Sequence, residues 1–159
     1  MFKELIWTKE NSLTNPFCNH VIDKFEIDPL KHDGKVNTLN PRIDKTVKLT
    51  KEVDITTIKY WEEEDKVLYN ALKFALDEYN IHLLNIGNKI NGEGYKLHPA
   101  GGLQIRDTGY KIQKYEPNCY YHWHHDWDLD QGWSRIFTYI WYLNPIEEEE
   151  GGWTEFVDG

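Results

Sequence analysis

The chain has 159 residues, of which 40% are hydrophobic and 14% aromatic, so it can bury a core and is not typical of a disordered protein. Its formal net charge of −9 argues against nucleic-acid binding, because such binding depends on basic patches that neutralise phosphates. No segment approaches the roughly 18 apolar residues of a membrane span, and the first residues lack the apolar run of a signal peptide. We therefore expect a cytoplasmic protein with no nucleic-acid or membrane partner and two unpaired thiols, Cys18 and Cys119, although a disulfide between them stays open. The sequence indicates no oligomeric state.

The first part of the chain is expected to hold a short strand, a helix and a loop. Residues 5–7 form a short apolar segment near the N-terminus, which predicts a first strand. Asn15 followed by Pro16 is typical of a helix start, and apolar residues recur four positions apart behind it, at Phe17, Val21 and Phe25. Residues 33–51 are polar and rich in turn residues, which indicates an exposed loop with room for one strand.

A second, longer helix is predicted from its cap and its apolar stripe. Thr56 or Thr57 can cap it, and the acidic residues that follow favour the positive end of a helix. The stripe consists of Leu68, Leu72, Ala75 and Tyr79. This spacing places one face of the helix against a core, so we interpret it as a structural helix packed on a sheet.

After Gly87, glycines punctuate short segments rich in β-forming residues. We predict strands at 103–106 and 110–115, joined by a turn at Asp107-Thr108-Gly109, and three more at 121–128, 136–143 and 153–157. Helices followed by antiparallel strands predict an α+β domain with a sandwich or barrel of strands.

The segment from His122 to Asp128 contains three histidines and two aspartates in seven residues. On a strand, alternate side chains share a face, so His124 and Asp126 would point the same way and His125 the other. A His-x-Asp pair supplies two of the three ligands of the facial triad that holds non-haem iron(II). A bare His-x-Asp is more often only a polar strand, and a zinc hydrolase using His122 with the same pair is an alternative.

The surrounding motifs narrow these alternatives. The chain has Tyr115, a turn, His124-x-Asp126, Arg135-x-x-Thr138, Tyr142-Leu143-Asn144 and Gly151-Gly152-x-Thr-x-Phe156, in that order. This series resembles the iron(II)- and 2-oxoglutarate-dependent oxygenases near prolyl 4-hydroxylase. Asn118 stands where these relatives usually have Gly, and Asn is the next best residue for a left-handed turn.

The resemblance implies a fold, a site and a reaction. The fold would be a single domain, 1–159, with a mostly helical support region at 1–90 and the first part of a double-stranded β-helix, or jelly roll, at 91–159. His124 and Asp126 would be iron ligands, and Tyr115, Thr138 and Tyr142 would line the 2-oxoglutarate pocket. Strand parity agrees with the last assignment, because Thr138 and Tyr142 lie four residues apart and share a face.

The implied reaction hydroxylates an unactivated carbon with O2 and 2-oxoglutarate and releases succinate and CO2; ascorbate is a further candidate cofactor. Peptidyl proline is the favoured substrate, and a free amino acid or another small molecule is the alternative. A non-catalytic β-sandwich binding module remains a rival from another class.

In this family the third ligand, a histidine, and a Lys or Arg that pairs with 2-oxoglutarate follow the Gly-Gly motif. Between Gly152 and Gly159 the sequence has no His, Lys or Arg. We therefore expect the native chain to continue and the strands of the β-helix to be incomplete at the C-terminus. Taken alone, these 159 residues are expected to bind iron weakly and to turn over poorly.

Overall fold

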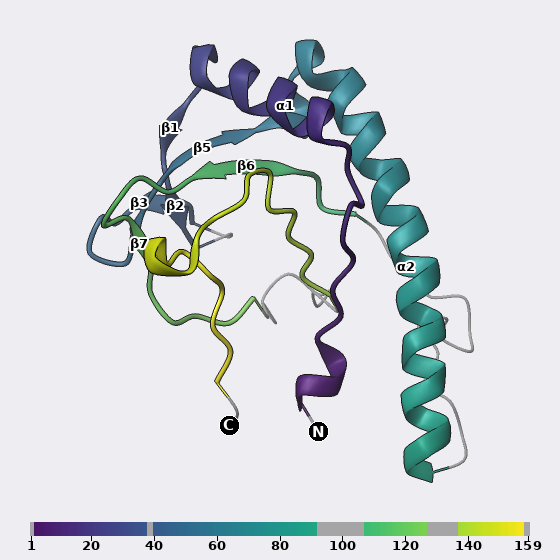
Figure 1. Ribbon diagram of the computed structural model, residues 1–159. Helices are drawn as coiled ribbons and strands as arrows, with labels where there is room; N and C mark the ends of the chain where they lie inside the picture. The colour runs from purple at the N-terminus through teal and green to yellow at the C-terminus, as the bar shows by residue number, and fades with distance from the viewer. Residues whose placement is uncertain (1, 38–39, 92–106, 127–136, 158–159) are drawn as a thin grey trace. The chain divides into compact units, whose positions relative to one another are not determined.

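The computed structural model describes residues 2–37, 40–91, 107–126 and 137–157 (Figure 1). Its described part mixes helices and short antiparallel strands, which confirms the α+β class. The chain divides into two compact units, one formed by residues 1–14, 56–110 and 154–159 and the other by 15–55 and 111–153. No helix in the described part is both long enough and apolar enough to cross a membrane.

The first unit is organised by helix α2, Glu62–Asn91. Two 3₁₀ turns, Ile55–Thr57 and Lys59–Trp61, lead into it, so the predicted threonine cap does not start the helix directly. Thr56 instead donates from Oγ1 to Asp65 Oδ1 at 2.6 Å, inside the first turns of α2. The predicted apolar stripe is confirmed, since Leu68 and Leu72 are buried and Ala75 and Tyr79 are half-buried.

The predicted strand at 5–7 is wrong, because Phe2–Leu5 forms a 3₁₀ turn. Side chains of α2 bind backbone carbonyls of this segment. Tyr79 donates its hydroxyl to Leu5 O at 2.7 Å, and His82 Nε2 lies 2.8 Å from Glu4 O. Trp7 packs against Tyr79, with ring centroids 6.0 Å apart.

The second unit contains helix α1, Asn15–Ile27, whose buried face carries Cys18, Val21 and Phe25. The predicted helix start and four-residue spacing are therefore confirmed. The described strands of this unit are β1 His32–Asp33, β2 Lys35–Val36, β3 Arg42–Ile43, β4 Lys48–Leu49, β5 Lys51–Asp54, β6 Lys111–Lys114 and β7 Tyr120–Tyr121. Residues 33–51 are thus not a loop with one strand, and the expected order of helices first and strands later is wrong.

The strands pair antiparallel as β1-β5-β6, β2-β3 and β4-β7. In the first sheet, β5 and β6 lie side by side, with Glu52 opposite Gln113 and Val53 opposite Ile112 (Figure 1). An ion pair of 2.7 Å between Lys114 on β6 and Glu26 on α1 links this sheet to the helix.

Strand β6 confirms the strand predicted at 110–115, and the turn before it is also present. Asp107 Oδ1 accepts the Gly109 N–H at 2.7 Å, and Gly109 has a φ of 91°, which glycine adopts without strain. However, β6 pairs with β5, and the predicted hairpin partner at 103–106 lies outside the described residues.

The three later strands are not formed where the structure describes them. Only Tyr120–Tyr121 is a strand in the 121–128 region, and 137–143 and 153–157 contain none. A strand is defined by the ladder it joins, and β7 has its ladder with β4, which His122 N–H extends by one bond to Val47 O at 3.0 Å. The alternating pattern of 137–143 still appears as burial, since 137, 139, 141 and 143 are half-buried while 138, 140 and 142 are exposed.

Candidate metal and co-substrate site

The turn that leads into the His-x-Asp segment has the predicted left-handed residue. Asn118 has a φ of 66°, and the turn closes through Cys119 N–H donating to Glu116 O at 2.8 Å. Asn tolerates this conformation better than most residues with a Cβ, so the turn forms here without a glycine. The turn delivers Tyr120 and Tyr121 to β7, opposite Leu49 and Lys48.

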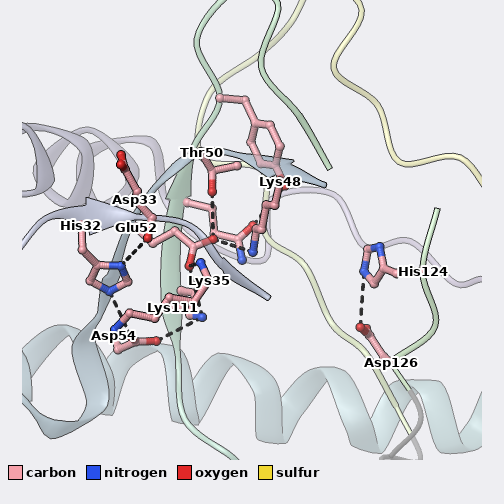
Figure 2. A network of polar contacts seen from close by, with 12 residues as sticks. His32, Asp33, Lys35, Lys48, Thr50, Glu52, Asp54, Lys111, His124 and Asp126 are labelled. Carbon is pink, nitrogen blue, oxygen red and sulfur yellow. Dashed lines mark hydrogen bonds and ion pairs between the residues drawn. The ribbon is translucent and has the colours of Figure 1, made fainter. Parts of the chain in front are cut away.

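His124 and Asp126 face each other three and five residues beyond β7 (Figure 2). His124 Nε2 lies 3.5 Å from Asp126 Oδ1, and both side chains are about one-third exposed, at 37% and 35%. His124 Nδ1 lies 2.9 Å from His122 O. A carbonyl oxygen can only accept, so Nδ1 carries a hydrogen in this contact, and Nε2 is the ring nitrogen that faces Asp126.

In each of these two side chains, one polar atom forms a hydrogen bond and the other faces the partner side chain. Thr138 donates from Oγ1 to Asp126 Oδ2 at 2.6 Å, which leaves Oδ1 on the side of His124. A metal ion between Nε2 and Oδ1 would accept a lone pair from each of these atoms. The donor set therefore fits a divalent metal, whose bonds to N and O ligands are about 2.0–2.2 Å, with the outer atoms held by hydrogen bonds.

In the part of the chain that the structure describes, the donor set consists of these two side chains. Among the described residues, no group of three or more His, Cys, Asp and Glu side chains could hold a metal ion. The His122 ring, which lies within that part of the chain, packs against Tyr120 at a tilt of 30°, with ring centroids 4.6 Å apart. A zinc site built from His122, His124 and Asp126 is therefore not formed.

Tyr115 directly follows β6 and belongs to the second unit, like His124 and Asp126. The residue keeps 46% of its surface exposed, yet burial of its hydroxyl end, together with the charge of Glu52 and the neighbouring Tyr121 and Tyr142 phenols, raises the pKa of Tyr115 to about 12. This phenol donates to Gln113 Oε1 at 3.1 Å. A phenol with this pKa stays protonated at neutral pH and can donate to an anionic oxygen.

Tyr142 is 57% exposed and lines a pocket of about 460 Å³. The other lining residues are Asn144, Pro145, Ile146, Glu147, Gly151, Gly152 and Trp153. Arg135 and Asp128 lie outside the described residues.

A buried charged cluster beside these tyrosines was not predicted. Lys48 on β4 and Glu52 on β5 are 3% and 0% exposed, and Lys48 Nζ lies 2.5 Å from Glu52 Oε1 (Figure 2). Thr50 donates to Glu52 Oε1 at 2.9 Å, and Lys111 Nζ lies 3.3 Å from Oε2. The alternation of Lys48, Thr50 and Glu52 on one strand face was the available signal, but polar residues at alternate positions usually indicate a solvated face.

The cluster shifts the titration of its own members in the same direction for different reasons. Burial lowers the pKa of Lys48, although its contact with Glu52 opposes this. Burial alone would raise the pKa of Glu52, but the Lys48 hydrogen bond and the charges of Lys111 and Lys48 outweigh it, so that this pKa is lowered. Glu52 has several donors, so its favourable contacts outweigh the effect of burial on its pKa. Lys48 has one direct carboxylate partner, so burial dominates its pKa.

Residues 110–159 match the family model described as the 2OG-Fe(II) oxygenase superfamily. The matched segment contains every predicted ligand and pocket residue, from Tyr115 to Tyr142, and covers less than half of the chain. The match supports the superfamily, and with it a dioxygenase function that uses iron(II) and 2-oxoglutarate. Neither a search of the curated proteins nor a search of the solved structures found a match.

Proposed function

We propose that this chain carries the metal-binding part of a prolyl 4-hydroxylase-like dioxygenase with a jelly-roll core. One observation carries the proposal: His124 Nε2 and Asp126 Oδ1 lie 3.5 Å apart with their outer atoms held by His122 O and Thr138 Oγ1, inside the segment that matches the oxygenase model.

In this proposal, His124 and Asp126 hold iron(II), and Thr138 orients the Asp126 carboxylate. Iron(II), when bound, would supply the site for O2 activation, so that substrate, O2 and 2-oxoglutarate give hydroxylated product, succinate and CO2. The protein's own contribution is to orient the reactants and to limit access of water.

The phenols of Tyr115 and Tyr142 are proposed to bind the carboxylates of 2-oxoglutarate. Tyr115 supports this role because its hydroxyl is a hydrogen-bond donor, and because the Gln113 amide that now accepts from it is an exchangeable neutral partner. Ascorbate is proposed as the reductant that keeps the metal as iron(II).

Peptidyl proline is the proposed substrate. A pocket of about 460 Å³ with Tyr142 and Trp153 in its wall lies in the size range of small-molecule sites, and flat aromatic faces suit an apolar ring such as that of proline. A free amino acid or another small molecule is the alternative that the same experiment separates.

The test is succinate formation from 2-oxoglutarate by the full-length protein with iron(II), O2 and ascorbate, using a proline-containing peptide or free amino acids as substrate. We expect peptide-stimulated succinate that is lost in His124→Ala and retained in the control His122→Ala, whose ring packs against Tyr120. Equal activity in wild type and His124→Ala contradicts the assignment, and stimulation by free amino acids alone contradicts the peptide substrate.

A further inference from the structure

The imidazole of His124 lies flat against the ring of Tyr121. Their centroids are 3.6 Å apart and their planes differ by 17°, a closer and more parallel stack than that of the neighbouring pair, Tyr120 and His122, at 4.6 Å and 30°. Tyr121 belongs to β7, where its backbone pairs with Lys48 of β4. The ring that touches His124 is therefore attached to a sheet, whereas His124 itself lies beyond the last ladder residue.

The Tyr121 ring is also held by a buried cation. Lys48 Nζ lies 4.4 Å from the Tyr121 centroid, within the range of a cation–π contact. That ammonium has little freedom, because Lys48 is 3% exposed and is bonded to Glu52, which is fully buried. A continuous series of contacts thus runs from Glu52 through Lys48 and Tyr121 to His124.

The second torsion of a histidine is broad and leaves the ring plane to its surroundings. The bond from Nδ1 to His122 O restrains one edge of the His124 ring, but the ring can still tilt about that bond. A flat neighbour at 3.6 Å removes the tilt. The two restraints together determine where Nε2 points, and in the structure it points at Asp126 Oδ1.

We propose that Tyr121, held by the Lys48–Glu52 pair, is a positioning residue that sets the ring plane of His124 and aims Nε2 at the metal. This inference rests on the proposed function, since it treats His124 as a ligand. It assigns to the buried charged cluster a role in the site besides stability.

Cobalt(II) titration, followed by visible absorption, measures this role without turnover. Tyr121→Phe keeps the ring and should bind within about twofold of wild type. Tyr121→Leu removes the ring and should weaken binding about 10- to 100-fold, the usual effect of losing a residue that orients a ligand. Tyr120→Leu is the matched control, because it removes the adjacent aromatic of the same strand and its stack on His122, and it should bind within about twofold.

The Lys48 contribution is tested by Lys48→Met combined with Glu52→Gln, which removes the cation and leaves neither charge buried alone. Loss of the cation–π contact should weaken cobalt(II) binding about three- to tenfold. Unchanged affinity in this folded variant overturns the role of Lys48.

Proton NMR of the metal-free wild type gives a second readout that needs no variant to fold. The ring protons of His124 should be shifted upfield by the Tyr121 ring, relative to those of the urea-unfolded protein, and the shift should persist in Tyr121→Phe. His124 signals at the positions of an unstacked histidine overturn the proposal. Wild-type cobalt(II) affinity in Tyr121→Leu, beside lost affinity in His124→Ala, refutes the positioning role alone, whereas unchanged affinity in His124→Ala refutes the proposed function as well.

Discussion

Replacing Glu52 by Gln tests how the buried charged cluster stabilises the second unit. The substitution keeps the size of the side chain but removes the charge that Lys48 contacts at 2.5 Å. Lys48 is 3% exposed and would remain as a buried cation whose nearest compensation is the Tyr121 ring. Leaving one member of a buried ion pair unpaired costs about 3–5 kcal/mol, so we expect a loss of that order in the free energy of unfolding at pH 7.

The matched change, Lys48→Met, should be milder. Glu52 would still have Lys111 Nζ at 3.3 Å and the Thr50 hydroxyl at 2.9 Å. We expect a loss of about 1–3 kcal/mol, the cost of weakening a buried polar group that keeps other partners. The double variant should lose less free energy of unfolding than the sum of the two single changes. Each single change also leaves the other charge buried without its ion-pair partner, and the double variant does not.

The effect of Glu52 on stability should depend on pH in a defined direction. Its pKa is lowered in the folded protein, so the unfolded chain binds the proton first, near pH 4.3. The stability that the charge contributes is present above that pH and is lost as the pH falls toward the folded-state pKa. The difference in the free energy of unfolding between wild type and Glu52→Gln should therefore shrink as the pH falls below the pKa of Glu52 in the unfolded chain.

Urea unfolding followed by tryptophan fluorescence measures these differences, since the chain has seven Trp residues. A loss of free energy of unfolding below about 1 kcal/mol for Glu52→Gln would refute the reasoning. A difference from wild type that stays constant as the pH is lowered would also refute it.

Three further changes test the candidate site and its turn. Thr138→Val removes the hydroxyl that donates to Asp126 Oδ2 at 2.6 Å, so metal affinity should fall about tenfold while Thr138→Ser retains it; equal affinity in Val and Ser would contradict the role. Tyr142→Phe should increase the KM for 2-oxoglutarate by a factor between about three and about ten, the effect of losing one hydrogen bond. An unchanged KM would show that Tyr142 does not make that contact. Asn118→Ala, at a φ of 66°, should cost about 1–2 kcal/mol of stability, and Asn118→Gly should not; equal stabilities would count against strain at this turn.

Local signals in the sequence predicted the helices well. The Asn15-Pro16 start and the spacing of Leu68, Leu72 and Ala75 depend on neighbours within one or two turns, and both helices form as expected. The left-handed turn at Asn118 was predictable for the same reason, since a single residue type carries the signal.

The strands were harder because a strand depends on a partner that is distant in sequence. Residues 33–51 contain several two-residue strands whose partners lie elsewhere, including β4, which pairs with Tyr120–Tyr121. Conversely, 137–143 has the alternation of a strand and the burial pattern to match, but joins no ladder among the described residues.

The candidate site was predicted as a set of residues but not as a set of contacts. His124, Asp126 and Thr138 come together in the structure, and this agrees with the motif that suggested them. Their roles as iron ligands and pocket residues stay predictions. The stack of Tyr121 on His124 and the buried Lys48 behind it could not be predicted, because both follow from the register of β4 against β7.

Anaerobic titration with iron(II), with and without 2-oxoglutarate, tests the central claim most directly. If His124 and Asp126 hold iron and the site binds the co-substrate, a visible charge-transfer band should appear only when both iron(II) and 2-oxoglutarate are present. The band should be absent in Asp126→Ala and present in His122→Ala. A band of equal strength in Asp126→Ala, or no band in the full-length wild-type protein at saturating iron(II) and 2-oxoglutarate, would contradict the account.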